Sequence, residues 1–162
     1  DLMDAVRGEH TVPPEIQSLF KVTDEKVREA GKSVIEERRS KLDALRDSWY
    51  NGGVSFKDYQ KARLKIIGEA ELLTDRAQRN VSNGVGQLED IYDALVGGSR
   101  PGMYGHGHDY YRDYNNRVQE IWANYCSLSL TRPDLIDELR KHEPTLVQAL
   151  DNVAAEIEKR IL

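Results

Sequence analysis

Two stretches with apolar residues at helical spacing, separated by a short glycine-rich break, constrain the fold of this chain more than any other feature. Between residues 24 and 50 charged side chains crowd the surface, and the apolar positions form one narrow stripe: Val27, Val34, Leu42, Leu45 and Trp49. A stripe this narrow is typical of a helix with a single packing partner, as in a two-helix hairpin, and not of a helix at the centre of a globular core.

The partner helix follows directly in the sequence. Asn51, Gly52 and Gly53 are typical of a helix end, and Ser55 with Asp58 three residues later resembles a capping box that starts a second helix. Apolar residues then recur at helical spacing to about Asn80. The sequence therefore predicts an antiparallel hairpin over residues 24–80, and it predicts which side chains face each other there: Leu42, Leu45 and Trp49 against Phe56, Tyr59 and Arg63.

The residues before the hairpin are predicted to be an extended lead-in. Pro13 and Pro14 fall early in this segment, and Thr23 or Asp24 offers an N-cap for the first long helix. We therefore expect a first domain, residues 1–81, made of the lead-in and the hairpin. The opening Asp1 is what we expect of a fragment excised from a longer protein.

The second half of the chain has the pattern of a compact helical domain, residues 82–162. Helices are predicted over residues 87–95, from about Asn116, over residues 135–142 and after Pro144. Their apolar faces predict a shared core: Ile121, Trp122, Tyr125, Leu135, Leu139, Leu146, Leu150 and Ile157. Because no segment shows a convincing strand pattern, the predicted fold is all-α, an extended antiparallel helical hairpin followed by a compact helical domain.

A long loop rich in glycine, histidine and tyrosine interrupts this second domain. Residues 97–114 hold five glycines and four tyrosines, together with His106 and His108. These histidines, with Glu120 downstream, are ligand types that zinc accepts. The alternative is a surface loop with solvated histidines, because their spacing is not diagnostic. We expect the loop to fold back towards Glu120 and form an ordered pocket. Ordering five glycines costs chain entropy, so a loop that carries them is favoured where the backbone passes close to another group or adopts a positive φ.

Composition narrows the classes of function. The 162 residues carry a net charge of -5, which disfavours nucleic acid as the main partner. No apolar run approaches the roughly 20 residues that span a bilayer, so a membrane role is not expected. The single cysteine, Cys126, has no partner for an internal disulfide. We expect a cytoplasmic or virion-associated protein that binds a protein partner, and its charged hairpin is a candidate for oligomer contacts.

The second half of the chain also carries four motifs in a recognisable order: IYDALVGG, YGHGHDYY, EIWANYCSLS and PDLIDELRKHEPTLVQALDNV. This order resembles the C-terminal toxin-like domains of phage head-morphogenesis (MuF-type) polymorphic toxins. More remotely, it is similar to the end of the anthrax lethal factor-type zinc peptidases. The resemblance implies a phage-associated effector module whose protein partner is a capsid or a parent polypeptide.

The resemblance to zinc peptidases also implies roles for particular residues. Glu120 matches the third zinc ligand of such enzymes, and Tyr114 or Tyr111 is the nearest match to the tyrosine that assists the transition state. Glu69 matches the catalytic acid of the HExxH helix, but Gly68 and Leu72 stand where its two histidines belong. A catalytic zinc site normally has three protein ligands, so the resemblance implies a degenerate metallopeptidase-like module.

Three functional hypotheses follow. The first is an effector or toxin-like module that does not by itself catalyse a reaction, and the second is a structural helical interaction protein of a phage particle. The third is a metal-dependent hydrolase with a non-standard zinc site made of His106, His108 and Glu120. The zinc content of the purified chain separates the third hypothesis from the other two.

Overall fold

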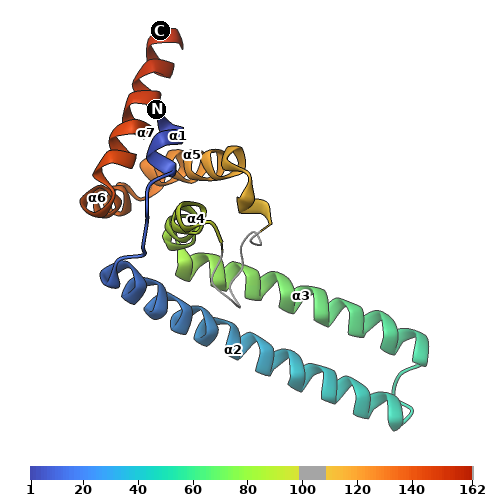
Figure 1. The fold of residues 1–162 in the computed structure, drawn as a ribbon. Coiled ribbons are helices and arrows are strands. Elements are labelled where there is room, and N and C mark those ends of the chain that lie inside the picture. Colours follow the sequence, from blue (N-terminus) through green and yellow to red (C-terminus); the bar gives the residue numbers. More distant parts are fainter. Residues whose placement is uncertain (99–108, 162) are drawn as a thin grey trace. The chain divides into compact units, whose positions relative to one another are not determined.

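The computed structural model describes residues 1–98 and 109–161, and every regular element among them is a helix (Figure 1). The predicted all-α class is therefore confirmed. The helices, in chain order, are α1 (Leu2–Val6), α2 (Pro14–Tyr50), α3 (Phe56–Ser82), α4 (Val85–Val96), the 3-10 helix η1 (Tyr110–Arg112), α5 (Tyr114–Thr131), α6 (Pro133–His142) and α7 (Pro144–Ile161).

The chain divides into two compact units. The hairpin unit is Lys21–Asn83, and the compact unit combines Asp1–Phe20 with Gly84–Leu162. The first twenty residues thus belong with the C-terminal helices, whereas the sequence analysis grouped them with the hairpin. The physical reason is burial: Val6, Ile16 and Phe20 lie in the core of the compact unit.

In the hairpin unit, α2 and α3 run antiparallel as predicted (Figure 1). The turn between them contains Gly52 with a φ of 73°, a conformation that glycine adopts without strain. Ser55 is the N-cap of α3, where its hydroxyl accepts a hydrogen bond from the Asp58 backbone N–H (3.2 Å) and donates one to the Asp58 carboxylate (2.6 Å). The predicted break and the predicted cap are both confirmed.

The two arms of the hairpin touch along the expected face. At the turn end, the Trp49 ring lies 5.4 Å from the Phe56 ring and 4.9 Å from the Tyr59 ring, measured between centroids. Towards the other end, Gly31 is buried, and a Cβ added there would lie 3.6 Å from the Thr74 methyl carbon. The arms therefore pack through aromatic side chains near the turn and through small ones farther away.

The predicted start of the first long helix was wrong. Helix α2 begins at Pro14, and Thr23 and Asp24 lie inside it. Proline suits the first helical position, because its fixed φ is already helical and its missing N–H would have no intrahelical partner there. The prolines thus start the helix, and the buried side chains of Ile16 and Phe20 hold its first turns in the compact unit.

Helix α4 is the most completely buried element of the compact unit. Leu88, Ile91, Tyr92 and Leu95 of this helix are all buried, and the helix packs mainly against α5. It ends at Gly97, whose φ is 82°. The positive φ favours glycine at this position, and a Cβ there would lie 2.1 Å from the Arg117 guanidinium, which would have to move.

Most of the predicted core is confirmed, with two corrections. Ile121, Tyr125, Leu135, Leu139, Leu146 and Leu150 are buried, but Trp122 is only partly buried and Ile157 is 40% exposed. On α7 the buried side chains lie in its first two turns, and every residue from Ala155 to Ile161 is exposed. The apolar stripe of α7 therefore continues past the end of its packing surface, which the sequence pattern alone does not reveal.

A nearly buried hydrogen bond between His10 and Glu143 holds the N-terminal segment inside the compact unit. The His10 Nδ1 atom lies 2.9 Å from the Glu143 carboxylate, and the side chains are only 9% and 14% exposed. The other ring nitrogen, Nε2, lies 3.2 Å from the Ala5 carbonyl oxygen at the end of α1. His10 thus links α1 to the junction between α6 and α7, and no local sequence pattern singles it out.

Candidate interaction site on the hairpin

Of the three residues predicted to form a zinc site, only Glu120 lies among the described residues. His106 and His108 lie outside those residues. Tyr114 is the first residue of α5, and its ring lies between two guanidinium groups, those of Arg7 at 5.2 Å and Arg117 at 4.9 Å. Within residues 1–98 and 109–161, no three histidine, cysteine or acidic side chains are placed to share a metal ion.

The two predicted glutamates belong to different units. Glu120 is half-buried on α5, and its charge contributes, after burial and two aspartates, to raising the pKa of Tyr111. Glu69 is exposed on α3, with its carboxylate 3.7 Å from the Lys65 ammonium. Gly68 and Leu72 are exposed on the same helix. The catalytic and metal-binding roles of Glu69, Tyr114, Glu120, His106 and His108 stay predictions.

We take a groove on the hairpin as the candidate interaction site, because apolar and cationic side chains line it together. It encloses about 350 Å³ between α2 and α3. Its lining, which we call the arginine groove, combines an apolar floor with cationic walls: Ile35, Arg38, Arg39, Leu42, Asp43, Arg46, Tyr59 and Arg63. The groove therefore offers both contact types that protein interfaces use, apolar area and charged hydrogen-bond donors.

The charges of the arginine groove are only partly neutralised by the chain itself. Arg46 pairs with Asp43 at 3.0 Å and lies 3.8 Å from Asp47. Arg38, Arg39 and Arg63 make no ion pair or hydrogen bond with any residue in the described part of the chain. Three guanidinium groups with free donors thus surround one apolar floor.

An aromatic cluster adjoins the arginine groove at the turn end of the hairpin. This tip cluster consists of Trp49, Tyr50, Phe56 and Tyr59, and Tyr59 also lines the groove. Tyr50 is 72% exposed and Phe56 is 54% exposed. Aromatic and arginine side chains are the residues that interfaces enrich, because they contribute large contact areas and directional hydrogen bonds.

Charge is distributed unevenly between the two units. Lys21–Asn83 contains fourteen lysines and arginines against eleven aspartates and glutamates, a net charge of +3. The rest of the chain has nine against seventeen, a net charge of -8, and together the two values give the -5 of the whole chain. The hairpin unit is therefore basic, although the net charge of the whole chain is negative.

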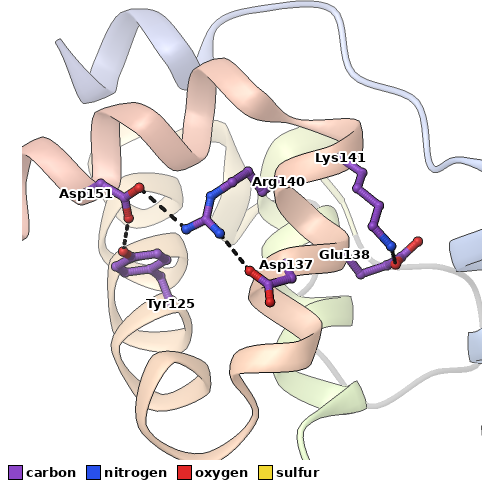
Figure 2. Close-up of polar contacts among 6 residues, drawn as sticks. All are labelled: Tyr125, Asp137, Glu138, Arg140, Lys141 and Asp151. Atoms are coloured by element: carbon purple, nitrogen blue, oxygen red, sulfur yellow. Dashed lines mark hydrogen bonds and ion pairs between the residues drawn. The ribbon is translucent and has the colours of Figure 1, made fainter.

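The compact unit has its own polar cluster, on the outside of its core (Figure 2). The Tyr125 hydroxyl of α5 donates a short hydrogen bond to Asp151 of α7, and Arg140 of α6 lies 3.5 Å from Asp151 and 2.7 Å from Asp137. Next to it, Lys141 pairs with Glu138 at 2.5 Å. Three helices thus meet in one network of polar contacts. Because the carboxylates of this network already have partners, we infer that it stabilises the packing of the helices.

This network predicts late ionisation of Tyr125. Burial and the hydrogen bond to Asp151 raise the pKa of Tyr125 to about 12, against an ordinary value of 10.0. A raised folded-state pKa means that the stabilising contribution of Tyr125 is complete below about pH 10 and is lost as the pH rises towards 12. In an ultraviolet phenolate titration, we expect Tyr125→Phe to remove one of the late-ionising groups, and Asp151→Asn to shift one to lower pH.

Burial also raises the pKa values of Tyr92 and Tyr111, so these two tyrosines also ionise late. The absorbance change of Tyr125 is therefore identified by comparing the variants with the native chain. Circular dichroism recorded at each pH shows whether the helices are still folded. Ionisation of all tyrosines in a single step near pH 10, with helicity retained, contradicts the prediction.

Comparison of the chain with models of protein families, with curated proteins and with solved structures found no match. The resemblance to phage-associated toxin domains accordingly stays a prediction. No described helix is both long enough and apolar enough to cross a bilayer.

Proposed function

We propose that this chain is a helical interaction module that binds another protein through the arginine groove and the tip cluster of its hairpin. The observation that carries the proposal is the exposed apolar and aromatic area on a hairpin whose remaining surface is highly charged. Exposed aromatic side chains beside a groove are costly to leave in water and are typical of surfaces that bury them against a partner.

The shape of the hairpin unit supports a binding role. Helices α2 and α3 contact each other through a narrow face, and most of their remaining side chains are exposed. Such a hairpin has little core of its own, so a partner that covers the arginine groove adds buried apolar area that the isolated arms lack. The resemblance to phage effector modules specifies a capsid or parent polypeptide as that partner, and it is compatible with the binding role.

Site-specific photo-crosslinking tests the proposal. We would place benzoylphenylalanine at Tyr50 or at Phe56, which are exposed in the tip cluster, and at Lys26, which is exposed on α2 outside the groove. After irradiation in extracts of the cells that naturally contain the chain, we expect the same discrete adduct from Tyr50→benzoylphenylalanine and Phe56→benzoylphenylalanine. The Lys26 variant is the matched control and should give none.

Mass spectrometry of the adduct decides between two forms of the proposal. An adduct of twice the chain mass of 18.5 kDa means that the hairpin binds a second copy. Any other adduct of defined mass identifies a different protein. If neither tip position gives an adduct, or if the Lys26 variant gives the same one, the hairpin is not a binding surface and the proposal is wrong.

A further inference from the structure

The three free guanidinium groups of the arginine groove limit what its partner can be. Arg38 and Arg39 come from α2 and Arg63 from α3, so the charges border the groove on both arms. Guanidinium groups bind carboxylates in a planar, bidentate geometry with two parallel hydrogen bonds, and the interaction is stronger where a partner excludes water. Carboxylates of a ligand would accept hydrogen bonds from these guanidinium N–H groups, which have no acceptor in the described part of the chain.

The floor of the groove adds a second requirement. Ile35 is 47% exposed, and the partly buried Leu42 and Tyr59 continue the apolar surface along the groove. Covering this floor requires apolar side chains on the same face of the ligand as its carboxylates. The ligand must therefore be amphipathic, with acidic residues beside an apolar stripe.

The architecture of the hairpin determines the backbone shape of the ligand. No strand occurs among residues 1–98 and 109–161, so the described surface offers no sheet edge to which an extended peptide could add. Helical grooves instead accept helices, whose anchors recur at i, i+3, i+4 and i+7. The lining residues on α2 run from Ile35 to Arg46, which is about 16 Å along the axis and matches roughly three turns of a docked helix.

From these observations we propose that the arginine groove binds an acidic amphipathic helix of a partner protein. This inference rests on the interaction role proposed above and adds the chemistry of the partner. Nucleic acid fits the groove less well, because its phosphates would leave the floor of Ile35 and Leu42 uncovered. A nucleic acid also needs a more extensive cationic surface than the arginines of this one groove.

Fluorescence anisotropy with a designed peptide tests the inference on the full chain. The probe is a labelled helical peptide of roughly 15 residues, with leucines at i, i+4 and i+7 and glutamates beside them. We expect saturable binding that weakens as sodium chloride rises from roughly 0.05 to 0.5 M. The same peptide with lysine in place of every glutamate, and a single-stranded oligonucleotide of equal charge, should bind at least about tenfold more weakly.

Matched arginine variants locate the binding site. The triple variant Arg38→Glu/Arg39→Glu/Arg63→Glu should raise the Kd for the acidic peptide by about tenfold or more. The control Arg28→Glu/Arg76→Glu reverses exposed charges on the same two helices outside the groove and should raise it by less than about threefold. Because charge reversal could perturb folding, Arg38→Gln/Arg39→Gln/Arg63→Gln and circular dichroism of every variant complete the set.

Three results overturn the inference: no binding of the acidic peptide, equal binding by the triple variants, or tighter binding of the oligonucleotide, which would indicate a nucleic-acid surface instead. Photo-crosslinking keeps this failure separate from failure of the interaction role. A position-specific adduct at Phe56 that excess acidic peptide does not displace leaves the interaction role intact and removes the acidic helix as its partner. Arginine-dependent peptide binding without any adduct supports the chemistry inferred for the groove and counts against the interaction role proposed for the chain.

Discussion

Replacing Ile121 with alanine should destabilise the compact unit by about 2 to 5 kcal/mol, the range for removing a fully buried isoleucine or leucine side chain. Ile121 is 0% exposed on α5 and belongs to the core shared with α4. The substitution removes buried side-chain carbons and leaves a cavity that neighbouring side chains fill only in part. The free energy of burying the removed atoms and the packing contacts around the cavity are both lost.

Ile157 supplies a matched control for this substitution. The sequence pattern places both isoleucines in the core, but Ile157 is 40% exposed near the end of α7. Ile157→Ala should therefore cost less than about 1 kcal/mol. Urea denaturation in a Trp49→Phe background gives the comparison, since the remaining tryptophan, Trp122, lies in the compact unit and reports on it. Equal costs for the two substitutions would show that the core is misplaced.

His10→Ala should cost about 3 to 5 kcal/mol, because it leaves the Glu143 carboxylate without its partner in a nearly buried position. It also removes the contact between the His10 ring and the Ala5 carbonyl, so α1 should become more susceptible to proteolysis. Denaturant unfolding and limited proteolysis near the N-terminus measure the two effects.

A double-mutant cycle separates the ion pair from the packing of the His10 ring. The variant His10→Leu/Glu143→Leu replaces the pair by apolar side chains and should be more stable than His10→Ala alone, because no charge is left buried. Strictly additive costs for the two single leucine substitutions would mean that the two side chains do not interact and that the prediction is wrong.

The sequence was sufficient where local chemistry decides the structure. Ser55 and Asp58 form a cap with each other, and Gly52 and Gly97 take positive φ values that other residues avoid. The signals at Gly52, Ser55 and Asp58 depend on a few neighbouring residues, so they predicted the hairpin turn without knowledge of the tertiary structure.

The start of α2 shows where local chemistry is ambiguous. Adjacent prolines suit an extended segment as well as the first turn of a helix. The outcome depends on the burial of Ile16 and Phe20 against residues far along the chain, such as Tyr92, whose ring centroid lies 6.4 Å from that of Phe20. Contacts between residues so far apart in sequence carry no local signature.

The arginine groove was missed for a related reason. Arg38 and Arg39 lie among charged residues on a long helix, a pattern that usually indicates a solvated face. Their position beside Arg63 depends on how the two arms align, and whether any acidic side chain of the described residues reaches them depends on side-chain placement. The spacing of Ile35, Leu42 and Arg46 on one face of α2 was the available clue, and it acquires meaning only once α3 is in place.

Because α2 and α3 are antiparallel, each part of α2 lies beside only a short stretch of α3. The length of the hairpin is therefore not set by contacts at its two ends. Removing seven residues from each arm, on the side of the Gly31 and Thr74 contact that lies away from the turn, would shorten it by about 10 Å while returning the remaining side chains to nearly the same faces. Related chains could therefore differ in the reach of this arm while keeping the same tip, so selection can adjust how far the binding surface stands from its base without redesigning either end.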